Sequence, residues 1–190
     1  MKRLLLIIIL TLSFQTLVKA DDIRDFRIEG MSIGNSLLDY FTKEEIKKER
    51  EFYRLGGKLL NGYSKVFKRN NNELYDNVVF YFESDDTKYI IQGISGRKYY
   101  KNNINECYEA QDKIVSEIKL ITPNAKIVTS KKRKHSRFKN SYIKATSFLL
   151  NDSDISVFCY DYSKKDTTSM DRLSVIIRFE KMNIFIRSNK

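Results

Sequence analysis

The stretch ISVFCYDY, residues Ile155 to Tyr162, decides the fold class because its residues alternate between two kinds of side chain. Successive side chains of a strand point to opposite faces of a sheet, so period-two alternation predicts a strand. One set is aliphatic apart from a cysteine: Ile155, Val157 and Cys159. The other set is mostly aromatic: Ser156, Phe158, Tyr160 and Tyr162. We therefore expect a sheet that buries its aliphatic face against a second layer.

A helix that could form this second layer is predicted after Asn102 and Asn103. Its apolar residues recur by threes and fours, which places them on one helical face. They are Ile104, Cys107, Tyr108, Ile114, Val115, Ile118 and Ile121. Pro123 follows just beyond the expected end, where prolines are common.

Cys107 and Cys159, the two cysteines of the chain, lie on the apolar faces of this helix and this strand. Two cysteines in an exported chain favour one disulfide, which would join the helix to the sheet. Closing a loop of about 52 residues stabilises the folded chain by roughly 4 kcal/mol in the chain-entropy model. Zinc ligands are too few, because His135 is the single histidine and no C-x-x-C motif occurs. We expect no metal and no cofactor.

Further strand patterns predict an antiparallel sheet. They lie at 26–29, 78–82, 88–94, 142–150, 154–162, 172–180 and 184–188. The stretch ESDDT, residues 83–87, is expected to be a hairpin loop, and NDSD, residues 151–154, a turn. Because short turns join the C-terminal strands, we predict an α+β fold: an antiparallel meander of about five to seven strands, one main amphipathic helix, and smaller N-terminal helices.

The N-terminal part carries two local signals. Thr42 to Glu45 matches a capping box, and the helix it begins is expected to run to about Leu55, with Gly56 and Gly57 as its stop. The stretch GMSIGNSLLDYF, Gly30 to Phe41, lacks both the lysine of a phosphate-binding loop and the G-x-G-x-x-G fingerprint. It is expected to be a turn from a strand into a helix.

Residues 1–20 have the three regions of a cleavable secretory signal. Lys2 and Arg3 precede the apolar run Leu4 to Leu10, and Val18-Lys19-Ala20 places small residues at −3 and −1 of a cleavage site. We therefore expect export to the periplasm or the medium, with residues 21–190 forming a single domain and no transmembrane segment after cleavage. No cysteine follows the signal for lipid attachment.

The chain is basic, with a formal net charge of +11. Removing Lys2, Arg3 and Lys19 with the signal lowers this charge to +8. The densest cluster, within 131–139, contains Lys131, Lys132, Arg133, Lys134, Arg137 and Lys139. Two interpretations stay open: a solvated loop between strands, or a patch for anionic lipid, polysaccharide or an acidic partner. Nucleic acid is not an expected partner of an exported chain.

The aromatic side of the strand at 154–162 also allows two interpretations. With Arg178 and Lys144 on neighbouring strands, it could be an exposed binding face for a peptide or a sugar. Large bare aromatic patches are rare on monomers, however, so we expect the N-terminal helices to cover it.

No catalytic set is recognisable in the sequence. A G-x-S-x-G motif is absent, and His135 lies among cations that disfavour its charged form, without an acid to orient it. The acidic pairs near Asp85 and Asp152 are typical of turns.

Several stretches resemble a family of small exported proteins from AT-rich marine alphaproteobacteria. These stretches are DFRIEGMSIGNSLLDYFTKEEI, KYIIQGISG, NINECYEAQDKIVSEI and ISVFCYDYS, in that order. The resemblance implies that Cys107 and Cys159 match the family's two cysteines, and it implies no activity. IEGMSIGNSLLDYF alone is similar to the opening of small lipoproteins that assist outer-membrane β-barrel assembly, although the lipid-attachment cysteine is missing and the meander is longer.

The sequence therefore favours an exported accessory or binding protein without catalytic activity, whose partner is an envelope protein or an anionic surface. An envelope hydrolase with an unrecognised active site is the alternative.

Overall fold

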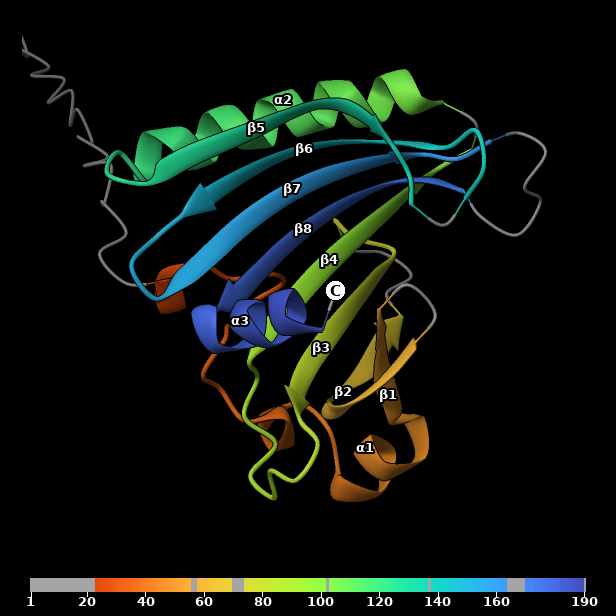
Figure 1. The fold of residues 1–190 in the computed structure, drawn as a ribbon. Helices are drawn as coiled ribbons and strands as arrows, with labels where there is room; N and C mark the ends of the chain where they lie inside the picture. The colour runs from red at the N-terminus through yellow and green to blue at the C-terminus, as the bar shows by residue number, and fades with distance from the viewer. Residues whose placement is uncertain are drawn as a thin grey trace, which may run out of the picture.

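The computed structural model describes residues 23–55, 58–69, 74–101, 103–136, 138–163 and 170–189 (Figure 1). Its centre is one eight-stranded antiparallel sheet with the order β1-β2-β3-β4-β8-β7-β6-β5. The predicted signal, residues 1–20, lies outside the described residues.

The strands are β1 (Glu51–Leu55), β2 (Lys58–Arg69), β3 (Asn77–Glu83), β4 (Gly93–Tyr100), β5 (Lys126–Lys134), β6 (Tyr142–Leu149), β7 (Ser153–Asp161) and β8 (Asp171–Phe179). The helices are α1 (Lys43–Glu49), α2 (Ile104–Ile121) and α3 (Glu180–Ser188), with short 3-10 turns η1 (Ile23–Asp25) and η2 (Leu37–Asp39). The α+β class is thus confirmed, with more strands than expected.

The sheet consists of two meanders rather than one. Strands β1 to β4 follow one another, α2 crosses over, and β5 to β8 then return so that β8 pairs with β4. Each meander ends in a helix, α2 or α3. The predicted single meander is therefore wrong in its connection, although each half has the expected antiparallel pairing.

The C-terminal half agrees best with the sequence. Strands β6, β7 and β8 and helix α2 lie where their patterns predict them. The expected strand at 184–188 is wrong, because these residues belong to α3. Helical spacing there buries Met182 and Ile186 on the sheet and leaves Ile184 exposed.

The N-terminal half differs more. The capping box at Thr42 is present, but α1 ends at Glu49 because Arg50 is extended, and β1 follows where the helix was expected to continue. Residues 56–57, the expected helix stop, lie outside the described residues. β4 begins at Gly93, so the predicted strand at 88–94 and its short hairpin loop are replaced by a longer connection.

The turn predicted at the stretch Gly30 to Phe41 is present, but the strand before it and the helix after it are less regular than predicted. Ile28 and Met31 exchange both backbone hydrogen bonds around Glu29 and Gly30, whose φ angles are 52° and 80°. Positive φ at both central residues is typical of a two-residue turn of type I′. An isolated bridge thus replaces the predicted strand at 26–29, and Ser36 caps only the short η2.

One face of the sheet, here called the covered face, is covered by two segments of the chain that lie over different strands. Helix α2 packs on β7 and β8, and the N-terminal segment packs on β3 through contacts such as Phe41 against Phe80, whose ring centroids are 5.5 Å apart. The largest side chains of this core are fully buried, among them Phe80, Phe82 and Phe148.

The predicted disulfide is present on the covered face. Cys107 of α2 and Cys159 of β7 are bonded, with 6.0 Å between their Cα atoms and a sequence separation of 52 residues. Next to it, the Gln111 side chain donates hydrogen bonds to the backbone carbonyls of Lys144 and Val157, at 3.1 and 2.9 Å. The helix is thus joined to the sheet by covalent and polar contacts as well as by apolar packing.

The opposite face, here called the open face, is covered at one end by α3. Met182 and Ile186 pack on Tyr63, Val79 and Tyr81. At the base of the helix the Arg178 guanidinium is paired with the buried Asp154 carboxylate at 2.8 Å. Asp154 therefore lies within β7, in agreement with the strand predicted at 154–162, and the turn predicted at 151–154 is confined to the residues before it. No helix among the described residues is long and apolar enough to cross a membrane.

Candidate binding face

Side chains from strands far apart in the sequence line up across the open face. The strand register places one row in the order Arg69, Asn77, Arg97, Ser174 and Phe158, on β2, β3, β4, β8 and β7. The next row holds Tyr99, Arg172 and Tyr160, on β4, β8 and β7. Paired residues of neighbouring strands project from the same face, so the two rows form one continuous surface.

Arg97 lies in the middle of this surface, surrounded by aromatic groups. Its guanidinium donates to the Tyr81 hydroxyl at 3.3 Å and lies 5.8 Å from the centroid of the Phe67 ring. Burial alone would lower the pKa of Arg97, but the phenol groups of Tyr81 and Tyr99 raise it, and the net pKa is above its ordinary value. Arg97 therefore keeps its charge in a partly buried setting.

Arg172 repeats this arrangement on the neighbouring strand. Its guanidinium carbon lies 4.4 Å from the centroid of the Tyr160 ring and 5.7 Å from that of Tyr162. The rings of Tyr160 and Tyr162 are nearly parallel, with centroids 6.1 Å apart. Cation–π contacts of this kind hold the arginine over the aromatic row but leave its charge uncompensated.

The α3 end and the middle of the open face differ in how their charges are paired. At the α3 end the carboxylates of Asp154 and Glu83 form ion pairs with Arg178 and Lys181, at 2.8 and 2.6 Å. Across the part of the chain that the structure describes, no carboxylate forms an ion pair with Arg97 or Arg172. The middle of the face is therefore positive.

Three buried side-chain atoms on the same surface have no hydrogen-bond partner within the described ranges: Asn77 Oδ1, Ser95 Oγ and Arg172 Nε. Ser95 is fully buried and lies between Val79 and Ile176 in the register, directly beside the first row. A buried polar atom without a partner costs about 1–3 kcal/mol, so such atoms are uncommon in folded proteins.

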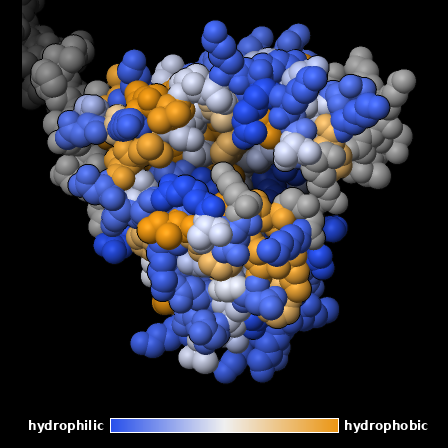
Figure 2. All heavy atoms as spheres, in the orientation of Figure 1, coloured by the Kyte–Doolittle hydropathy of each residue, from blue (hydrophilic) through white to orange (hydrophobic). Residues whose placement is uncertain are grey.

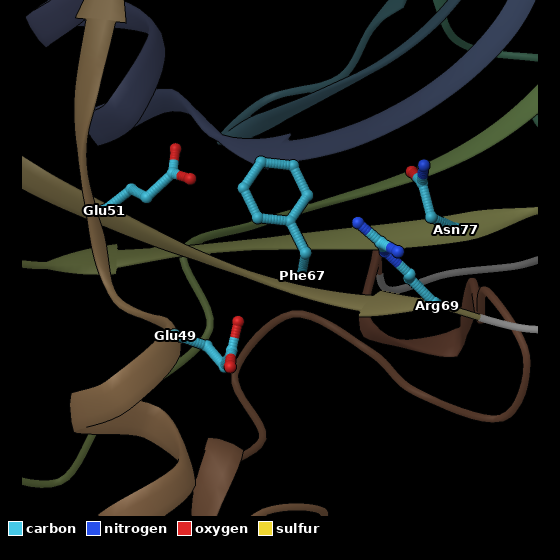
Figure 3. Close-up of a pocket in the computed structure, with 5 residues that line it drawn as sticks. All are labelled: Glu49, Glu51, Phe67, Arg69 and Asn77. Carbon is cyan, nitrogen blue, oxygen red and sulfur yellow. The ribbon is translucent and has the colours of Figure 1, made fainter.

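A pocket of about 630 Å³ adjoins the first row at its β2 end (Figure 3). Phe67 lies at its centre, with Glu49 and Glu51 on one side and Arg69 and Asn77 on the other. Glu51 is paired with Lys65 at 3.0 Å, and the Lys65 ammonium lies 4.6 Å from the centroid of the Phe67 ring. The pocket thus adds polar groups and one aromatic surface to the open face.

The predicted cover over the aromatic residues is wrong. Leu37 and Ile46 of the N-terminal segment belong to the core of the opposite face, with Val157 and Cys159. Phe158 and Tyr160 stay partly exposed on the open face. In the view of Figure 2, apolar side chains gather in separate patches divided by hydrophilic ones.

The predicted basic neighbours of the aromatic residues are also different. Lys144 projects from the covered face, where it pairs with Asp112 of α2 at 2.8 Å, and Arg178 is engaged by Asp154. Arg97 and Arg172 take the expected place beside the aromatic row. Sequence reasoning missed them because strand register between distant segments was not visible in any local pattern.

The basic cluster is not a loop. Lys131, Lys132, Arg133 and Lys134 belong to β5, an edge strand of the sheet, whereas Lys139 lies in the turn that follows and Arg137 lies outside the described residues. Lys132 pairs with Asp161 at 2.6 Å, and this hydrogen-bonded contact raises its pKa. Lysines and a register shift on an exposed edge hinder pairing with another chain.

His135 lies beyond the end of β5, among aromatic rings. Its Nδ1 accepts a hydrogen bond from the Phe138 backbone at 3.3 Å, and its ring centroid lies 4.9 Å from that of Phe138 and 5.8 Å from that of Tyr162. Within the described residues no group of three or more His, Cys, Asp or Glu side chains could hold a metal ion.

A scan of protein-family models and searches of curated proteins and of solved structures found no match to this chain. The two family resemblances therefore stay predictions.

Proposed function

We propose that this chain is an exported binding protein without catalytic activity, and that the open face is its ligand surface. The observation that carries the proposal is the pair Arg97 and Arg172. Both are held over aromatic rings, and neither has a carboxylate partner among the described residues. Charged groups held in fixed positions without a counter-charge are typical of a binding site, because a structural role would be served by an ion pair.

Export is supported by two independent features. The pattern of residues 1–20 is that of a cleavable signal, and the Cys107–Cys159 disulfide is of a kind that persists in oxidising compartments. N-terminal sequencing of the protein recovered from the periplasm or the medium should begin at Asp21. Recovery from the cytoplasm with residues 1–20 intact would contradict export without bearing on the open face.

The ligand surface is tested by comparing two variants with equal loss of charge. Arg97→Gln with Arg172→Gln removes two cations from the open face, and Lys113→Gln with Lys119→Gln removes two exposed cations from α2. The immobilised wild-type protein and both variants are incubated with soluble envelope extract, and the retained protein and carbohydrate are measured. We expect the α2 variant to retain material as the wild type does, and the open-face variant to lose it.

Equal retention by both variants would contradict the proposal, as would no retention by the wild type. Turnover of ester, peptide or glycan substrates by the purified protein, lost on substitution of His135, would support the hydrolase alternative instead.

A further inference from the structure

The charge of the open face indicates the charge of its ligand. Arg97 and Arg172 lie on paired strands, β4 and β8, in adjacent rows of the register. Their planar guanidinium groups match the geometry of carboxylates, with which arginine forms bidentate hydrogen bonds. At the α3 end the Asp154 and Glu83 carboxylates pair with cations, whereas the arginines of the middle rows have no carboxylate partner among the described residues.

The neighbouring groups favour a ligand that combines charge with many hydroxyls. The Asn77 amide, which lines the pocket beside the first row, can donate and accept hydrogen bonds, and the guanidinium groups of Arg97 and Arg172 can donate them. The hydroxyl groups of a sugar satisfy donors and acceptors alike. The C–H face of a pyranose packs on aromatic rings, and Phe67, Phe158 and Tyr160 offer such rings on this face.

A peptide fits this surface less well. Peptides that add to a sheet do so at an edge, where unpaired backbone groups are available. The rows described here lie on β3, β4, β8 and β7, which are interior strands, and their backbone groups are paired with neighbouring strands on both sides. A peptide lying on this face would have to satisfy its own backbone groups from side chains alone.

The surface is also long. From β2 to β7 the first row crosses four strand spacings, or about 19 Å at the usual separation of neighbouring strands. The row begins at the pocket around Phe67 and ends at the ring of Phe158. An extended chain of several sugar units can contact the whole row, whereas a single small anion cannot.

We propose that the open face binds an acidic oligosaccharide that lies across the strands, with carboxylates at Arg97 and Arg172 and sugar rings on Phe67, Phe158 and Tyr160. The inference rests on the proposed function and adds the chemical class of the ligand. One end of the bound chain lies on the Arg69 and Asn77 side of the pocket, across Phe67 from the Glu49 and Glu51 carboxylates (Figure 3).

The test uses the mature protein and oligogalacturonate, a carboxylated oligosaccharide, followed by calorimetry and by NMR of the backbone amides. The matched control ligand is the methyl ester of the same oligosaccharide, which has the same sugars without the charges. We expect binding of the acid form only, weakening with added salt, and amide shifts that map to β3, β4, β8 and β7.

Single substitutions then test the assigned contacts. Arg97→Gln and Arg172→Gln should each weaken binding at least about tenfold, since hydrogen bonds to charged groups are lost. Arg172→Lys should restore part of the affinity, and Lys113→Gln on α2 should leave it unchanged. Because Arg97 is partly buried, thermal unfolding of each variant is recorded to check that it folds. The amide mapping uses the wild-type protein alone, so it does not depend on the folding of any variant.

Several outcomes would overturn the inference: equal binding of the methyl ester, amide shifts confined to β5, or tighter binding of a hexaglutamate peptide on the same residues. The first would remove the role of charge, the second would move the site to the basic edge, and the third would change the class of ligand. If envelope material is still retained through the open face while oligogalacturonate does not bind, the ligand class is wrong and the proposed function stands.

Discussion

The covered and open faces of the sheet use the same strands but differ in what their side chains contact. On β3, Val78, Phe80 and Phe82 are fully buried beneath the N-terminal segment. On β4 and β8, Arg97 and Arg172 project from the other face toward aromatic rings, with no counter-charge among the described residues. The covered face therefore supplies most of the stability of the fold, and it offsets the cost of the unpaired polar groups on the open face.

The largest expected effect compares one phenylalanine from each face. Phe80→Ala removes a fully buried ring from the covered face and should lower the free energy of unfolding by about 3–5 kcal/mol. Phe158→Ala removes a partly exposed ring from the open face, and we expect a loss below about 2 kcal/mol because less area is buried there. Urea unfolding measures both. Equal losses would contradict the division of roles between the faces.

The second-largest expected effect is the loss of stability on removing the disulfide. Replacing Cys107 and Cys159 by serine should cost about 4 kcal/mol in the chain-entropy model for the 52-residue separation. In a chain of this size that loss lowers the melting temperature by on the order of 10 °C. Calorimetry of the double variant, with reduction of the wild type as a control, measures the shift. An unchanged melting temperature after verified reduction would show that apolar packing alone holds α2 on the sheet.

For each single side chain, a smaller effect is expected at alkaline pH, and it involves one tyrosine from each face. Burial raises the pKa of Tyr75, on the covered face, and of Tyr53, beside Tyr81 on the open face, to about 12 each. Unfolded tyrosines ionise near pH 10, so between pH 10 and 12 the folded chain holds protons that the unfolded chain has released. Stability should therefore fall as the pH rises through this window, by up to about 1.4 kcal/mol per pH unit for each group.

The absorbance of phenolate during a pH titration checks this expectation. Tyr75→Phe and Tyr53→Phe should each remove one late-ionising group. If every tyrosine of the folded protein ionised near pH 10, the burial of both the Tyr75 and the Tyr53 rings would be contradicted.

The smallest expected effect lies at α1, which helps to cover the N-terminal half. Thr42 accepts a hydrogen bond from the Glu45 backbone N–H at 3.2 Å, and Ile46 anchors the helix in the core. Thr42→Ala should cost about 1 kcal/mol through the lost cap. Thermal unfolding measures the loss, and Thr42→Ser, which keeps the hydroxyl, is the control. A loss equal to that of Phe80→Ala would mean that α1 is essential to the covered face.

The sequence predicted the elements whose two sides differ. In α2 one side is buried and the other is mostly not, and in β7 one side is aliphatic while the other is polar and aromatic, so the periodicity of both was visible. In β5 nearly every residue is exposed, and no alternation marks it; pairing with β6 makes it a strand. The stretch at 184–188 was too short to separate a helix from a strand, and packing of Ile186 against the open face favours the helix.

The candidate site was predicted only in part. Phe158, Tyr160 and Tyr162 were placed together from one strand. The exposure of Phe158 and Tyr160 was misjudged because the position of the N-terminal segment depends on packing rather than on local pattern. Asn77, Arg97 and Arg172 come from three strands, and each looks ordinary in its own segment.

Local periodicity and the count of cysteines were sufficient for the main helix, the strand beneath it and the bond between them, because these features depend on residues that are near in sequence or unique in the chain. The order of the strands, the choice of covered face and the arginine–aromatic rows required the folded chain. The rows depend on the register of β4 against β8, and the strand order and the covered face depend on pairing and packing between segments that are distant in the sequence.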